Sequence, residues 1–144
     1  MKRIMVLWCA VFLMAFAGHA LAQERGVLVV TIDGFNNEKG DAKMSIFDSK
    51  ESFAAGDTGF RVAAATIKGG KAEWVLSDLP FGLYAIKVYH DENGNGKLDK
   101  NMMGAPKEQY GFSNNARDSF GPPSYEQARF VFSKTNAAIA ITVE

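Results

Sequence analysis

The sequence has little cysteine, little histidine and no excess charge of either sign. Cys9 is the one cysteine among 144 residues, so disulfides within the chain and zinc sites built on several cysteines are excluded. Sixteen Lys and Arg residues balance sixteen Asp and Glu residues, which leaves no basic field to attract nucleic acid. A length of 144 residues and a hydrophobic content of 47% predict one ordinary globular domain.

The N-terminus has the three parts of a secretory signal peptide. Lys2 and Arg3 precede an apolar run over residues 4–17, and Ala20 and Ala22 supply the small residues of a cleavage site. The run is shorter than the roughly 20 apolar residues that span a membrane. We therefore predict a signal peptide over residues 1–22 and one domain over residues 23–144. The mature protein would be periplasmic or secreted, without a transmembrane anchor, and its expected partner is an unknown envelope protein or glycan.

Seven stretches of the remaining chain alternate apolar and polar residues, and turn-forming residues separate them. These stretches are residues 27–32, 42–48, 61–67, 71–77, 83–90, 127–133 and 137–143. The side chains predicted to face the core are Leu28, Val30, Ile32, Met44, Ile46, Trp74, Leu76, Tyr84, Ile86, Val88, His90, Phe130, Phe132, Ile139, Ile141 and Val143. The pattern predicts an all-β fold, a seven-stranded antiparallel Greek-key-like sandwich, with Gly69-Gly70 closing a hairpin.

Residues 91–124 form the longest stretch without this alternation, and loops of such length are usually functional. Tyr110, Phe112, Phe120 and Tyr125 are expected to fold the loop back onto the core. An alternative is a sugar- or peptide-binding surface built on Tyr110 and Phe112.

The start of this loop matches the first nine positions of the twelve-residue calcium loop. Asp91, Asn93 and Asn95 would supply alternate side-chain oxygens, and Gly96 would allow the sharp turn. The next donors would be the Lys97 carbonyl and the Asp99 carboxylate.

The twelfth position holds Met102 instead of the usual Glu, and a strand precedes the loop, so this is not an EF-hand. Glu108 is the nearest downstream carboxylate that would close the site, whereas Asp118 and Glu92 are less convenient. Two certain carboxylates predict weak calcium affinity, with a Kd of about 10⁻⁴ to 10⁻³ M. The alternative is a polar turn without an ion, because Asn and Gly stabilise turns by themselves.

His90 beside Asp91 raises the possibility of general-base catalysis. No Gly-x-Ser-x-Gly elbow occurs, and the histidine sits where a strand ends, so we predict no catalytic residues and a protein that is not an enzyme. The alternative is a small periplasmic hydrolase that uses His90 with the carboxylates of Asp91, Glu92 and Glu108.

Two segments carry a resemblance to a known family. His90-Asp91-Glu92-Asn93-Gly94-Asn95-Gly96-Lys97-Leu98-Asp99 and the later YGFSNNA segment over residues 110–116 resemble the bacterial DUF2141 family of exported proteins. The resemblance covers nearly all of the mature chain and implies a small exported domain without established catalytic residues. Its Leu-Pro-x-Gly-x-Tyr turn over residues 79–84 is similar to that of transthyretin-like and CnaB-like sandwiches. The function expected from these features is a non-enzymatic binding or structural module of the cell envelope.

Overall fold

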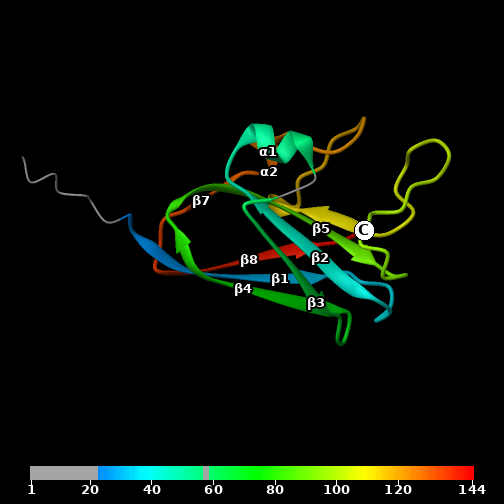
Figure 1. Ribbon diagram of the computed structural model, residues 1–144, viewed down its shortest axis with the longest axis horizontal. Helices are drawn as coiled ribbons and strands as arrows, with labels where there is room; N and C mark the ends of the chain where they lie inside the picture. The colour runs from blue at the N-terminus through cyan, green and yellow to red at the C-terminus, as the bar shows by residue number, and fades with distance from the viewer. Residues whose placement is uncertain (1–22, 57–58) are drawn as a thin grey trace, which may run out of the picture.

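The computed structural model describes residues 23–56 and 59–144, which form eight strands and three short helices (Figure 1). The predicted signal peptide, residues 1–22, lies outside the described residues. The strands are β1 (Arg25–Asp33), β2 (Asp41–Phe47), β3 (Arg61–Thr66), β4 (Lys71–Pro80), β5 (Gly82–Asp91), β6 (Tyr110–Phe112), β7 (Phe130–Phe132) and β8 (Asn136–Thr142). The helices are α1 (Lys50–Ala55), the 3₁₀ helix η1 (Ser113–Asn115) and α2 (Tyr125–Ala128). None of the helices in the described part of the chain has the length and apolar character needed to cross a membrane.

The strands form two sheets, as the predicted all-β sandwich requires. One sheet has the order β4-β1-β8, and the other has the order β3-β2-β5-β6 with β7 also paired to β5. Two details differ from the seven-stranded antiparallel prediction. The strand β6 adds an eighth, and β1 pairs with β8 in parallel, with Val30 opposite Ile139. Alternation of apolar residues reports which face of a strand is buried, but it does not report strand direction or partner.

The glycine pair at 69–70 makes a turn, but the strands beside it do not pair as the predicted hairpin. Lys68 and Lys71 exchange backbone hydrogen bonds of 2.8 and 3.1 Å across the turn. Beyond it, β3 pairs with β2 and β4 pairs with β1, so the chain passes from one sheet to the other. Ile67 and Ala72 flank the turn and are both buried in the core. The residues on both sides of the turn therefore contribute to the main core at the point where the chain crosses between the sheets.

The main core lies between the two sheets and contains the residues predicted to face inward. Leu28, Val30, Ile32, Ile46 and Ile86 are fully buried there. Only three of the predicted side chains lie partly at the surface and pack against this core: Trp74, Phe130 and Ile139. The sandwich is thus organised by the period-two pattern of the sequence.

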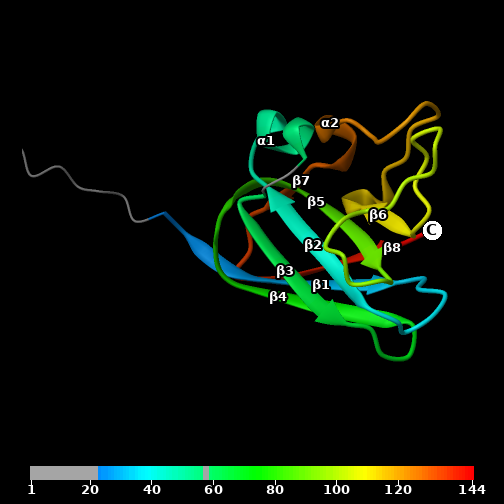
Figure 2. The same cartoon turned by 45° about the vertical axis from the view of Figure 1, so that its right-hand side comes forward.

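A second cluster lies on the opposite face of the five-stranded sheet. It consists of Phe47, Phe53, Ala85, Phe112, Ala116, Tyr125 and Ala128. Figure 2 shows α1 and α2 close together above the end of this sheet. Burial of Phe112 and Tyr125 confirms that the long segment folds back, although Phe120 is fully exposed. Phe112 is nearly buried and Tyr110 is half-buried, so of the two residues of the alternative sugar- or peptide-binding surface only Tyr110 offers substantial exposed area.

Candidate functional site

The candidate calcium loop begins where β5 ends. The strand β5 pairs with β2, and this pairing places Ala42 opposite His90 and Asp41 opposite Asp91. Because successive side chains of a strand point to opposite faces, His90 enters the main core and Asp91 faces the loop. Both side chains are fully buried.

The Asp91 carboxylate is the centre around which the loop folds. Its Oδ1 accepts the N–H of Asn95 (3.0 Å), and its Oδ2 accepts the N–H of Gly96 (2.9 Å). The ammonium of Lys43 lies 3.7 Å from Oδ2. Gly96 has a positive φ of 75°, so it provides the sharp turn expected at this position. The buried charge therefore has two hydrogen-bond donors and one cation as partners.

The structure brings three further predicted side chains together in the loop. The amide Nδ2 groups of Asn93 and Asn95 donate to the two oxygens of Asp99, at 2.7 and 2.9 Å. The amide oxygens of the same two residues accept the backbone N–H groups of Asn95 (3.0 Å) and Lys97 (2.8 Å). The side chains of the first, third, fifth and ninth loop positions are thus joined in one hydrogen-bonded network.

Glu108 reaches the loop from the downstream segment. Its Oε1 accepts the N–H of Glu92 (3.0 Å), and its Oε2 accepts the N–H of Asp99 (2.9 Å). Of the other two carboxylates considered, Glu92 turns toward His90, and Asp118 accepts a bond from Gln127 (3.5 Å). Glu108 is therefore the downstream carboxylate that holds the two ends of the loop.

These contacts fit either a cation loop or a polar turn. No group of three or more His, Cys, Asp or Glu side chains suitable for holding a metal occurs within residues 23–56 and 59–144. A site here would rely on amide and carbonyl oxygens as well as carboxylates, which is usual for calcium. Each carboxylate and amide oxygen has a second lone pair beyond the one used in the hydrogen bonds described above.

Tyr89 ties the loop to the sheet. Its hydroxyl donates to the carbonyl of Gly96 at 2.8 Å. Burial raises the pKa of this hydroxyl above its ordinary value, and the negative charges of Asp91 and Glu108 raise the pKa further. The phenol therefore stays protonated and remains a donor well beyond neutral pH.

His90 lies on the core side, away from the loop network. Its Nε2 is 2.7 Å from the carbonyl oxygen of Lys39, so Nε2 carries a proton and donates it. Its Nδ1 lies 3.8 Å from the nearer carboxylate oxygen of Glu92 and has no hydrogen-bond partner among the described residues. A methyl group at Gly40 would collide with the Asp91 carbonyl, so glycine allows the preceding loop to close over His90. Of the carboxylates proposed to act with His90, the structure places Glu92 beside its ring, whereas Asp91 and Glu108 bind backbone N–H groups.

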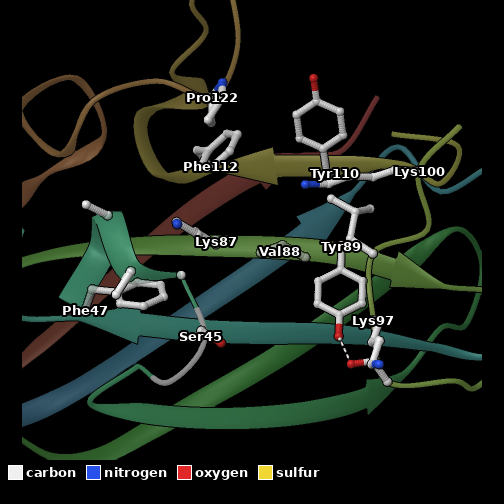
Figure 3. A pocket seen from close by; sticks show the side chains of 15 residues that line it. Ser45, Phe47, Lys87, Val88, Tyr89, Lys97, Lys100, Tyr110, Phe112 and Pro122 are labelled. Atoms are coloured by element: carbon white, nitrogen blue, oxygen red, sulfur yellow. Dashed lines mark hydrogen bonds between the residues drawn. The ribbon is translucent and has the colours of Figure 1, made fainter. Parts of the chain in front are cut away.

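A cavity of about 540 Å³ opens beside the loop, on the outer face of the five-stranded sheet (Figure 3). The sheet contributes Ser45, Lys87, Tyr89, Tyr110 and Phe112 to its lining. Residues 96–98 and Lys100 form the loop side, and residues 54–56, Phe47, Val88 and Pro122 complete the lining. Sequence reasoning did not identify this pocket, although Lys87 between Ala85 and Tyr89 marks a polar position on the outward face of β5.

The family described as "uncharacterized protein conserved in bacteria (DUF2141)" matches residues 30–140 of the chain. The chain belongs to the DUF2141 family. Both resemblance segments lie inside the matched range, so the expected family membership is confirmed. No curated protein and no solved structure gives a significant match to this DUF2141 chain. A function for it must therefore be argued from its own residues.

Proposed function

We propose that this protein is an exported, non-enzymatic binding or structural module of the cell envelope in which calcium orders the loop over residues 91–99. One observation carries the calcium proposal. The side chains of Asp91, Asn93, Asn95 and Asp99 share one hydrogen-bonded network, and Glu108 closes it. These are the oxygen-bearing side chains that a calcium loop uses at its odd positions, together with a carboxylate from outside the loop.

Calcium would replace amide donors around the Asp99 carboxylate. Asn93 and Asn95 now direct their NH₂ groups at Asp99, which partly compensates its charge. Rotation of these amides would bring their oxygens toward a bound cation instead. The carbonyl of Lys97 would complete the set of loop donors.

The ammonium of Lys43 would compete with a bound cation for the Asp91 carboxylate. Its ammonium lies 3.7 Å from Asp91 Oδ2 and also 3.7 Å from Asp41 Oδ2. A positive charge this close to a buried carboxylate opposes the entry of another cation. It is consistent with weak affinity and with a loop that keeps its shape before an ion binds.

The non-enzymatic part of the proposal rests on the position of His90. Its ring lies in the main core against Phe35, with centroids 5.2 Å apart, and it lines neither the 540 Å³ cavity beside the loop nor a second cavity of about 270 Å³ beside Tyr84. A general base must reach the proton that it removes from a substrate. A binding surface therefore suits this end of the molecule better than a hydrolytic centre.

Thermal unfolding in EDTA, and then across a range of calcium and magnesium concentrations, tests the calcium proposal. We expect a calcium-selective rise in Tm, since a ligand at about 100 times its Kd adds about 2.7 kcal/mol to the native state. Asp91→Ala should lower stability even in EDTA, because the N–H of Gly96 loses its acceptor and the N–H of Asn95 keeps only Asn93 Oδ1. It should also abolish the calcium-dependent rise.

Three further variants separate ion binding from loop stability. Asp99→Asn should remove the calcium response and should cost less stability in EDTA than Asp91→Ala, because it loses one exposed amide hydrogen bond. Asp118→Asn, in the same long segment, should respond like the wild type. Lys43→Gln should strengthen calcium binding, because it removes the competing charge. Equal calcium responses in the wild type and Asp99→Asn would show that the ion binds elsewhere or not at all.

A further inference from the structure

The charged side chains that line the 540 Å³ pocket are all basic among the described residues. They are Lys87, Lys97 and Lys100, and no described Asp or Glu lines the pocket. Asp91, Asp99 and Glu108 belong to the neighbouring loop, but their carboxylates face backbone N–H groups and amides there. Three cationic side chains around one concavity favour a local positive potential, which the nearby charges of Asp91 and Glu108 offset in part at Tyr89.

Lys87 is held at one end of the pocket by the second hydrophobic cluster, called here the outer cluster, on the outer face of the five-stranded sheet. Its ammonium donates to the carbonyl of Phe53 at 2.6 Å and lies 4.2 Å from the Phe53 ring centroid. It also lies 5.1 Å from the centroid of the Phe47 ring. These contacts keep a positive charge beside apolar walls, where electrostatic attraction is stronger than in open water. Lys97 and Lys100 are exposed and come from the loop side.

Aromatic residues form part of the remaining walls, where Tyr89 and Tyr110 are half-buried and Phe47 and Phe112 are almost fully buried. Tyr89, Tyr110, Phe112 and Phe47 line the pocket, and the Tyr110 and Phe112 rings meet edge to face with centroids 5.8 Å apart. Figure 3 shows the amino end of Lys100 beside Tyr110. A volume of about 540 Å³ falls within the range of roughly 300–1,000 Å³ that is typical of small-molecule sites.

We propose that this pocket binds a small organic anion, an acidic group attached to an apolar aromatic or aliphatic body. The exposed Lys97 and Lys100 would attract the acidic group, and the half-buried rings of Tyr89 and Tyr110 would contact the apolar body. A simple inorganic anion would gain the charge interaction only, and an organic cation would gain the apolar contact while being repelled. Affinity should therefore require both parts of the ligand.

The loop connects this ligand site with the proposed calcium function. Residues 96–98 and Lys100 form one side of the pocket, and the Tyr89 hydroxyl holds the Gly96 carbonyl at 2.8 Å. The ligand class thus deepens the proposed binding function. The pocket itself rests on the lysines and aromatic walls, and only its dependence on calcium rests on the loop proposal.

Isothermal titration calorimetry of the purified protein with naphthalene-2-sulfonate tests the ligand class. Inorganic sulfate supplies the acidic group alone, and 2-naphthylmethylammonium supplies the same apolar body with the opposite charge. We expect naphthalene-2-sulfonate to bind at least tenfold more tightly than either of them, because each lacks one of the two interactions. Binding no tighter than that of 2-naphthylmethylammonium would overturn the proposal.

Two variants locate the binding. Lys100→Gln should weaken naphthalene-2-sulfonate binding about threefold, the effect of losing one exposed charge interaction. Ala54→Trp should weaken it more than tenfold, because Ala54 is exposed on the pocket wall and the added ring would fill the space. Lys68→Gln is the control, since Lys68 lies at the turn between β3 and β4, outside the pocket lining. Wild-type affinity in both Lys100→Gln and Ala54→Trp would overturn the proposal.

Repeating the titration in EDTA and in calcium separates the two proposals. Tighter anion binding in calcium supports an ion-ordered wall as well as the pocket. Equal binding in both conditions supports the pocket and contradicts calcium control of its wall. Failure to bind in both conditions, together with a calcium-selective rise in Tm, would overturn the anion site while leaving the calcium loop supported.

Discussion

The two faces of the five-stranded sheet are built from the same strands but have different roles. On the inner face, Met44, Ile86 and Val88 are buried against the three-stranded sheet. On the outer face, α1, α2 and η1 cover one end, whereas Lys87 and Tyr89 border the pocket at the other. The inner face therefore forms the main core, whereas the outer face is divided between the second cluster and an accessible pocket. Alternation along a strand allows both, because neighbouring side chains experience different environments.

Truncation of an inner-face residue should have the largest effect. Ile86 is fully buried in the main core, so Ile86→Ala should lower the free energy of unfolding by about 2–5 kcal/mol. The cost combines lost apolar burial with the cavity left behind. Chemical denaturation measures it, and Val75→Thr on the exposed side of β4 should change stability by no more than about 0.5 kcal/mol. Similar losses in both variants would contradict the assignment of the inner face as the main core.

Removal of the hydrogen bonds that join the sheet to α2 should have an intermediate effect on stability. The buried Ser113 hydroxyl accepts the N–H of Ile86 at 2.8 Å and donates to the Ala128 carbonyl at 2.6 Å. Ser113→Ala should cost about 1–3 kcal/mol, because both buried groups lose their partner. Equilibrium denaturation should show little change for Ser133→Ala, an exposed serine after β7. An unchanged free energy of unfolding in Ser113→Ala would mean that the packing of α2 and η1 on the sheet does not depend on these two hydrogen bonds.

The smallest expected effect is a loss of stability at alkaline pH. It can be compared between one buried tyrosine of the main core and one of the outer cluster. Burial raises the pKa of Tyr84, in the main core, and of Tyr125, in the outer cluster, above 10.0, and Asp48 adds to both shifts. The folded protein therefore holds these protons when the unfolded chain has released them, so stability should fall as pH rises above about 10. The phenolates would also lose the hydrogen bonds from Tyr84 to Pro80 (2.9 Å) and from Tyr125 to Leu83 (3.2 Å).

Denaturation at several pH values, combined with the ultraviolet absorbance of tyrosinate, measures this effect. Tyr84→Phe and Tyr125→Phe should each make stability depend less on pH in the alkaline range. An unchanged pH dependence in both variants would contradict burial of the two hydroxyls in the native state.

The predicted core agrees well with the structure because its signal is local. Leu28, Val30 and Ile32 alternate along one strand, and burial of that face follows from strand geometry whichever strand pairs with it. The all-β sandwich follows from several such stretches. The parallel β1–β8 pair and the separation of β3 from β4 were not predicted, since pairing depends on contacts distant in sequence.

The candidate loop was also partly predictable. The spacing of Asp91, Asn93, Asn95 and Asp99 indicated which side chains would gather, and Glu108 was the nearest downstream carboxylate. Lys43 was not foreseen as a partner of Asp91, because it lies on another strand and its position depends on the register of β2 with β5.

The sequence by itself determined which residues face the core, where the polar loop begins and to which family the chain belongs. These properties depend on local geometry and on motifs of fixed spacing. Only the tertiary structure decided the strand partners, the burial of His90 away from the loop network, and the meeting of Lys87, Lys97 and Lys100 around one pocket. Those features depend on which distant segments pack together, because a side chain's electrostatic environment is set by its neighbours in space.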